Sequence, residues 1–339
     1  KANTHDEINE LAFVLMRSST PEVKAGDEIW YTEAQHLLTI LIRCLKNSGQ
    51  SEWINLHNVL HLLENFGAQG RGLFDFIERY ADDRTFSQFK GFISSNAKMM
   101  SSFTTMARNA LQMVGDPAIA SVLSRNELDF DQLRQRKTVL YVIVPSKKLK
   151  LYGPLLNLFY TQFFAAQDDL AYTTQGLPLY VLYDEFGHSM IPNFDTIATT
   201  IRKYRVSLSI ILQDYGQLKQ QYGDHAAKTI LAGGMRTKIF YAGLDTETST
   251  MVEKMLGTVE YEYKKGGGKS WRQTNLMNAD RISRMDADQA LCITANQEPI
   301  LLKTTPCYRN RNLDRLMQLR PHPLPAPHSS SNLDYVPLS

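Results

Sequence analysis

The chain has 339 residues, 43% of them hydrophobic, which is enough for one large domain or for a core with an inserted subdomain. Its formal net charge of +2 does not indicate a nucleic-acid partner. Such a partner would have to be recognised by a local basic patch. Three scattered cysteines exclude a disulfide framework and a zinc site. No apolar run approaches the roughly 18 residues of a membrane helix, and the first residues lack the pattern of a signal peptide.

The first part of the chain has helical periodicity and no strand pattern. Helices are predicted over residues 5–16, 30–46, 54–66, 72–82 and about 86–114. Acidic residues in the first turn of the first helix suit the helix dipole. We therefore expect residues 1–29 to be a helical lead-in and residues 30–125 to form an all-α inserted domain.

From residue 138 onward, apolar runs alternate with helical patterns. Strands are predicted at 138–144, 177–183, 207–212 and 237–242, and helices at 151–166, 194–205, 223–232 and 246–256. The apolar runs at 138–144 and 177–183 are typical of strands buried on both faces. This alternation predicts an α/β core with a doubly wound sheet over residues 126–312, in which 290–295 and 300–303 are edge strands.

Two carboxylates, Asp184 and Glu185, follow directly after the apolar run at 177–183. Open parallel sheets bind ligands just outside the carboxyl ends of their strands, and carboxylates there need a cationic partner. A magnesium ion that carries nucleotide phosphates would meet this need. Asp184 would then hold the ion, and Glu185 would orient and deprotonate the attacking water. The alternative is that the pair begins a loop or caps a helix.

A polar amide, Gln213, stands at the end of the next predicted strand. If the two strands are neighbours, this amide can touch both the γ-phosphate and the attacking water. Three cationic residues, Arg202, Lys203 and Arg205, lie near the end of the helix between the two strands.

Four stretches of the second half resemble the TraG-type coupling proteins of type IV secretion systems. They are Tyr-Asp-Glu-Phe-Gly (183–187), Ile-Arg-Lys-Tyr-Arg-Val (201–206), Ile-Leu-Gln-Asp-Tyr-Gly-Gln-Leu (211–218) and Tyr-Gly (222–223). The resemblance covers most of residues 5–310. It implies a RecA-like, mostly parallel, doubly wound sheet with an inserted all-α domain.

The resemblance also implies an ATP hydrolase that uses ATP and Mg²⁺. In this interpretation Asp184 binds the metal, Glu185 is the catalytic base and Gln213 senses the γ-phosphate. Arg202 is predicted to be the arginine finger that reaches the nucleotide of a neighbouring subunit, with Arg205 as the reserve nucleotide contact. Each arginine could instead be a surface residue that pairs with an acid, and Gln213 could only cap a loop.

The partners implied by the resemblance are those of a secretion motor. They are further copies of the chain in a homo-hexamer, components of the secretion channel, and a relaxase–DNA complex or protein effectors. The family acts at the cytoplasmic face of the bacterial inner membrane, where it is held by an N-terminal segment that this sequence does not contain.

A phosphate-binding loop of the form Gly-x-x-x-x-Gly-Lys-[Ser/Thr] does not occur in the sequence. The Gly-Lys-Ser at 268–270 fails the pattern because Tyr263 stands where the first glycine belongs. We therefore expect the chain to be a C-terminal fragment that hydrolyses ATP negligibly by itself. Residues 264–275, which hold four cations and Trp271, are interpreted as a mobile basic loop that either contacts single-stranded DNA or is simply solvated.

Two other functions stay open. One is a DNA translocase of the FtsK type. The other is a non-catalytic adaptor that docks substrates or channel components and has an incomplete nucleotide site. Residues 313–339, rich in proline and serine, are expected to form an extended or disordered tail.

Overall fold

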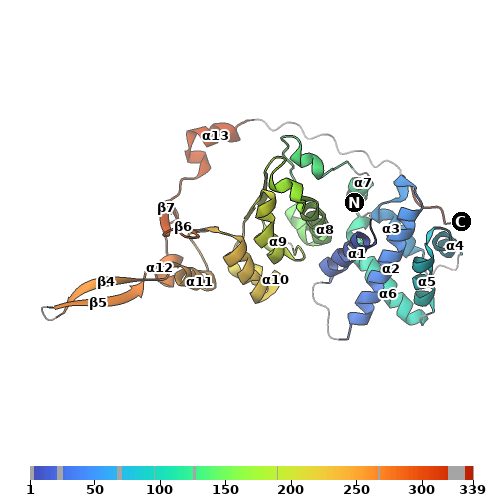
Figure 1. Ribbon diagram of the computed structural model, residues 1–339, viewed down its shortest axis with the longest axis horizontal. Helices are drawn as coiled ribbons and strands as arrows, with labels where there is room; N and C mark the ends of the chain where they lie inside the picture. The colour runs from blue at the N-terminus through green and yellow to red at the C-terminus, as the bar shows by residue number, and fades with distance from the viewer. Residues whose placement is uncertain are drawn as a thin grey trace. The chain divides into compact units, whose positions relative to one another are not determined.

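The computed structural model describes residues 4–20, 26–66, 71–94, 96–124, 127–188, 190–265, 268–319 and 333–338. The chain divides into two compact units, each with its own hydrophobic core (Figure 1). The first unit comprises the chain up to residue 179, residues 188–192 and the segment from residue 326 onward. The second comprises residues 180–187 and 193–325. None of the described helices combines the length and the hydrophobicity needed to cross a bilayer.

The first unit is built mainly from helices. They are α1 (His5–Ser19), α2 (Glu28–Asn47), α3 (Leu56–Glu64), α4 (Gly72–Tyr80), α5 (Asp83–Ile93), α6 (Ala97–Ala110), α7 (Pro117–Leu123) and α8 (Leu149–Gln167). A capping box begins α1: the Thr4 hydroxyl accepts from the backbone N–H of Glu7, whose carboxylate accepts from the backbone N–H of Thr4. The described residues between 30 and 125 contain no strand, as predicted.

Helix α2 is the centre of this unit, and it packs against α1, α3, α4, α5 and α6. Its apolar side chains extend around much of the helix, so its second half is almost fully buried. Leu37, Leu38 and Leu41 are each 0% exposed. Burial of each leucine side chain contributes on the order of 2 kcal/mol, so these residues anchor the helices around them.

The prediction of a single helix over 86–114 is wrong. The segment contains two helices: α5 ends at Ile93, and α6 begins at Ala97. Asn96 is the N-cap of α6, and its side-chain oxygen accepts from the backbone N–H of Lys98 at 2.9 Å. Asparagine and serine side chains compete for backbone hydrogen bonds, which favours a new helix start over a continuous helix.

Residues 138–144 are not the buried strand that their apolar pattern predicts. They pair with no strand in the described part of the chain. Val139, Tyr141 and Ile143 are 74%, 77% and 72% exposed. The side chains that alternate with them, Leu140 and Val142, are 43% and 42% exposed. The period of two that indicates a strand is therefore present, but among the described residues only Val144 of this segment packs against the core.

The second unit contains all or part of every strand in the described part of the chain. Its elements are β1 (Leu179–Tyr183), α9 (Phe194–Thr200), β2 (Val206–Ile210), α10 (Tyr215–Thr229), β3 (Thr237–Tyr241), α11 (Thr246–Leu256), β4 (Thr258–Lys265), β5 (Gly268–Asn275), α12 (Ala279–Ser283), β6 (Gln289–Thr294), β7 (Ile300–Lys303) and α13 (Arg311–Met317). Helix α10 begins well before the predicted residue 223, because Asp214 caps it.

Strands β1 and β2 are neighbours and run parallel. The backbone N–H of Ile211 donates to the carbonyl of Tyr183 at 3.0 Å, and the carbonyl of Ile211 accepts from the N–H of Phe186 at 3.1 Å. In parallel strands, the N–H and the C=O of one residue bond to two different residues of the neighbouring strand, as Ile211 does here. The expected burial of β1 on both faces is wrong, because Tyr180 and Leu182 are 74% and 79% exposed.

The remaining strands are antiparallel. Strands are present at both predicted positions, 290–295 and 300–303, but only β7 is an edge strand, because β6 lies between β3 and β7. Strands β4 and β5 form a separate two-stranded ribbon next to α11 and α12 (Figure 1). The prediction of a loop at 264–275 is therefore wrong for residues 264–265 and 268–275, which belong to β4 and β5, and residues 266–267 lie outside the described part.

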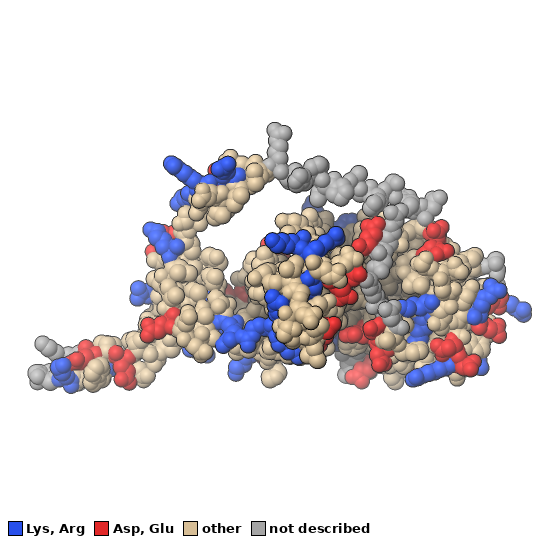
Figure 2. All heavy atoms as spheres, turned by 45° about the horizontal axis from the view of Figure 1, so that its top comes forward, with Lys and Arg blue, Asp and Glu red and all other residues tan. Residues whose placement is uncertain are grey.

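The ribbon of β4 and β5 carries both signs of charge, which Figure 2 shows as acidic and basic side chains close together along it. Lys269 forms an ion pair with Glu262, with 2.9 Å between the ammonium nitrogen and the carboxylate oxygen. The register pairs Glu262 with Trp271 and Tyr261 with Arg272, so Trp271 and Arg272 lie on opposite faces. Lys269, two residues before Trp271, shares the face of the ring, whereas Arg272 lies on the other face.

The expectation of an extended or disordered tail over 313–339 is wrong for its first residues, whereas residues 333–338 are extended. Residues up to Met317 belong to helix α13. Residues 320–332 lie outside the described part. Residues 333–338 pack against the first unit, where Val336 is only 1% exposed.

Candidate functional site

Asp184 and Glu185 form the turn that directly follows β1. Both residues are exposed, whereas Tyr183 before them and Phe186 after them are buried. Glu185 has φ of 53°, in the left-handed region that a residue with a Cβ seldom adopts. The Asp184 carboxylate accepts from the backbone N–H of Glu185 at 3.0 Å, which stabilises this turn. The two acids thus stand in solvent at the carboxyl end of a strand.

An aromatic cluster lies beneath the acidic turn. The Phe186 ring is 0% exposed, and its centroid lies 4.5 Å from that of Phe194 and 5.7 Å from that of Tyr222. The ring of Tyr183 meets it edge-on at 5.2 Å. Such pairs add about 0.5–1.5 kcal/mol each beyond area burial. The cluster joins the turn to α9 and α10 and fixes where the carboxylates stand.

Gln213 follows β2 and lies beside Glu185, as the sequence predicts for neighbouring strands. Its side-chain nitrogen donates to a carboxylate oxygen of Glu185 at 3.4 Å. The carboxamide oxygen of Gln213 accepts from the side-chain nitrogen of Gln217 at 3.3 Å. A chain of polar groups therefore runs from Glu185 through Gln213 to the first turn of α10.

Gln217 is a residue of this site that the sequence interpretation missed. The side-chain oxygen of Gln217 accepts from the backbone N–H of Gln213 at 3.4 Å. The side chain lies so close to Gly187 that a Cβ there would be 2.3 Å from this oxygen. The signal in the sequence is the spacing Asp214-x-x-Gln217, which is typical of the start of a helix.

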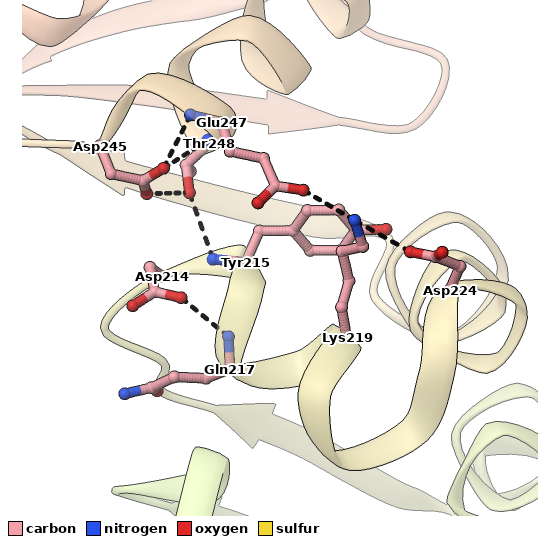
Figure 3. A network of polar contacts seen from close by, with 8 residues as sticks. All are labelled: Asp214, Tyr215, Gln217, Lys219, Asp224, Asp245, Glu247 and Thr248. Atoms are coloured by element: carbon pink, nitrogen blue, oxygen red, sulfur yellow. Dashed lines mark hydrogen bonds and ion pairs between the residues drawn. The ribbon is translucent and has the colours of Figure 1, made fainter.

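Helix α10 is held in place by a network of polar contacts with α11 (Figure 3). Asp214 caps α10 by accepting from the backbone N–H of Gln217 at 2.8 Å. The N–H of Tyr215 donates to the hydroxyl of Thr248 at 3.2 Å, and that hydroxyl donates to Asp245, the N-cap of α11. Hydrogen bonds thus connect the start of α10, which follows Gln213, to the start of α11.

Lys219 completes this network. Its ammonium lies 2.8 Å from the Glu247 carboxylate and 2.9 Å from the Asp224 carboxylate (Figure 3). Hydrogen bonds to Glu247 and then to Asp224 raise the pKa of Lys219. Its charge is therefore balanced inside the network, and Lys219 is a structural cation.

The two predicted arginines do not lie at the same edge as the acids. Arg202 belongs to the turn 201–204, and Arg205 directly precedes β2, whereas Gln213 follows that strand. The five residues of β2 span about 17 Å at the usual rise per residue. Ile201 and Tyr204 are buried and anchor this turn, and Arg202 and Arg205 are exposed. Within one chain the structure joins Asp184, Glu185 and Gln213, and it leaves both arginines at the other end of β2.

The acidic edge suits Mg²⁺ bound together with a phosphate ligand. The described residues contain no group of three or more His, Cys, Asp and Glu side chains placed to hold a metal ion. Mg²⁺ in nucleotide sites typically takes one or two carboxylates, keeps several waters and receives its other ligands from phosphates. Two exposed carboxylates with an amide next to them fit that ligand set and fit no closed metal cage.

The family model for type IV secretory system conjugative DNA transfer matches residues 3–326. The chain belongs to this family. A VirD4 protein of Rhizobium radiobacter is 25% identical over 264 residues, which make up 73% of this chain and 38% of the relative. A probable conjugal transfer protein TraG of Sinorhizobium fredii is 22% identical over 311 residues, or 87% of this chain and 48% of the relative. The chain thus spans less than half of these relatives.

Solved structures of the conjugative coupling protein TrwB share the fold. Its unbound form superposes with a TM-score of 0.70 at 16% identity, and the match covers 89% of this chain and 69% of TrwB. TrwB in complex with ADP and Mg²⁺ gives a TM-score of 0.67 with the same identity and coverage. The likeness confirms the RecA-like α/β fold class predicted for this family member.

Proposed function

We propose that the chain is the greater part of the motor of a type IV secretion coupling protein, which uses ATP to deliver DNA–protein or effector substrates to the channel. The observation that carries the proposal is the contact between Gln213 and Glu185, which places an amide beside two carboxylates at the ends of neighbouring parallel strands. TrwB, which shares the fold, binds ADP and Mg²⁺. Family membership favours a coupling protein over a translocase of the FtsK type.

In the proposed mechanism each residue of the edge has one task. Asp184 would hold Mg²⁺, which would supply positive charge against the phosphates. Glu185 accepts the proton of the attacking water, which its exposed carboxylate can reach. Gln213, which hydrogen-bonds to Glu185, would also be placed to donate to the γ-phosphate of a bound nucleotide. Gln217 positions the Gln213 amide for this contact.

Arg202 is proposed to act on the nucleotide of a neighbouring subunit, with Arg205 as the reserve nucleotide contact. An exposed arginine at the far end of β2 cannot serve its own edge, so the proposal requires a ring such as a hexamer. The helical residues 30–125 are proposed to be an inserted domain, and residues 126–312 the motor core. We place the working protein at the inner membrane of its host.

The test is ATP turnover by the natural gene product that carries this chain. Glu185→Gln removes the proton acceptor and keeps the size of the side chain, so DNA-stimulated hydrolysis should fall at least about 100-fold while ADP binding persists. Glu260→Gln, at an exposed glutamate of β4, is the matched control and should change neither quantity. Equal turnover of Glu185→Gln and the unsubstituted protein would contradict the proposal. A protein without DNA- and Mg²⁺-dependent turnover would instead be the non-catalytic adaptor.

A further inference from the structure

The end of the chain is bound as an extended peptide to the all-helical unit. Residues 333–338 have no helix or strand of their own, and they lie against α3 and the start of α4 (Figure 1). The family match ends at residue 326, before this segment. The contact is therefore a feature of this chain that its family membership does not account for, and it is independent of the proposed motor activity.

The centre of the contact is the side chain of Asn58, which is 0% exposed. Its amide nitrogen donates to the carbonyl of Asp334 at 2.9 Å, and its oxygen accepts from the backbone N–H of Val336 at 3.0 Å. His61 adds a hydrogen bond from its ring Nε2 to the Val336 carbonyl at 3.1 Å. Three backbone groups of the segment are thus satisfied by two side chains of α3. Hydrogen bonds to the peptide backbone are how extended peptides gain affinity in many recognition modules.

Side chains of the segment fill complementary positions. Val336 is 1% exposed within the core of the unit, and Leu338 packs against the same core. The Tyr335 ring meets His57 and His61 edge-on, with centroids 4.7 and 4.9 Å apart. Burial is the main cause that lowers the pKa of His57.

The receptor surface is shaped for a backbone that passes close by. Gly72, the first residue of α4, would carry a Cβ only 3.0 Å from the backbone carbon of Leu338. A larger residue at position 72 would therefore push the segment away. Pro337 restricts Val336 to extended conformations, which reduces the conformational freedom that the segment loses when it docks.

We propose that α3 and the start of α4 form a binding groove for extended peptides, and that the chain's own Asp334–Leu338 occupies it as a tethered, displaceable ligand. The groove recognises an aromatic–aliphatic–proline–aliphatic pattern through Tyr335, Val336 and Leu338. A tethered ligand has a high effective concentration. A peptide of the same pattern from a partner protein must therefore compete with it, and the tail controls access to the groove.

The experiment uses the whole chain and a fluorescein-labelled peptide of residues 333–339 (Leu-Asp-Tyr-Val-Pro-Leu-Ser). Val336→Asp in the protein releases the resident segment, because it would bury a charge without a partner. Fluorescence anisotropy should show at least about tenfold tighter binding of the peptide to this variant than to the unsubstituted chain. Tyr335→Ala serves as a milder releasing variant should Val336→Asp fail to fold.

Two controls locate the binding. Adding Asn58→Ala to Val336→Asp removes two hydrogen bonds to the peptide and should weaken binding at least about tenfold. A labelled peptide that itself carries the valine-to-aspartate change should not bind. The proposal is overturned if the released, folded chain does not bind the peptide, if both chains bind it equally, or if Asn58→Ala has no effect.

Discussion

At the edge of β1 and β2, one glycine influences where the Gln213 amide lies. Gly187 closes the run Asp-Glu-Phe-Gly, and the missing Cβ leaves room for Gln217. Gln217 in turn accepts from the backbone N–H of Gln213 and donates to its side chain. The position of Gln213 relative to Glu185 therefore depends on an empty volume at residue 187.

Gly187→Ala should displace the Gln217 carboxamide and impair turnover more than folding. The new Cβ would lie 2.3 Å from the Gln217 oxygen, which is the end of a flexible side chain and can move. We expect ATP turnover of the natural gene product to fall about 10- to 100-fold, because small misplacements of catalytic groups have effects of that size. Thermal unfolding should be nearly unchanged.

The matched control is Gly91→Ala, at a glycine of α5 whose added Cβ would meet nothing within 4 Å. It should leave turnover unchanged. If the two alanine variants hydrolyse ATP at the same rate, Gln217 has no part in positioning the sensor.

The main residues of the candidate site could be predicted from the sequence because each ends a strand. Asp184 and Glu185 follow one apolar run and Gln213 the next, so strand adjacency alone brings them together. Gln217 could not be predicted in the same way, because its place depends on the close approach at Gly187. A contact between the turn after β1 and the first turn of α10 carries no periodic signal.

At the scale of elements, the apolar pattern predicts the backbone conformation of a segment better than it predicts the burial of that segment. Residues 138–144 and β1 have the same apolar composition, but only β1 gains a neighbouring strand in the described part of the chain. Val139 and Leu182 are more than 70% exposed. An apolar composition therefore shows that a segment could be buried, but it does not show that another element covers it. The helix break before α6 was missed for a related reason, because a capping asparagine interrupts an otherwise continuous pattern.

The start of α7 is stabilised by a group that should make the first unit sensitive to acid. Asp116 caps α7, and its carboxylate also accepts from Lys148 and Tyr152. The hydrogen bond from Lys148, followed by those from Tyr152 and the backbone of Ala118, lowers the pKa of Asp116 to about 2. A carboxyl group with a lowered pKa stabilises the folded state above its unfolded pKa of about 4, and this contribution is lost as the pH falls toward about 2.

Thermal unfolding between pH 5 and pH 2 measures this contribution. Asp116→Asn keeps a side chain that can cap α7 but removes the titrating group. The variant should unfold at a lower temperature than the unsubstituted chain at pH 5, and this difference should shrink as the pH approaches 2. Glu78→Gln, at an exposed residue of α4, is the control. A difference that stays constant over the whole pH range would refute the assignment.

At the scale of the whole molecule, the proposed role of Arg202 requires an assembly. Arg202 lies before β2, and the acidic edge lies beyond the other end of that strand. If Arg202 acts on the nucleotide of a neighbour, Arg202→Ala should lower the turnover of the assembled protein about 1,000-fold and leave ADP affinity unchanged. Arg236→Ala, at an exposed arginine beside β3, should do neither. Normal turnover by Arg202→Ala would exclude it as the arginine finger.

The central claim is that Asp184 holds a magnesium ion together with a nucleotide. Its most direct test is the ADP affinity of the natural gene product, measured by calorimetry with and without Mg²⁺, for the unsubstituted protein and for Asp184→Asn. We predict that Mg²⁺ tightens ADP binding to the unsubstituted protein and has little effect on the variant, while both bind metal-free ADP equally. The same gain in affinity from Mg²⁺ in both proteins would contradict the assignment of this edge as the nucleotide site.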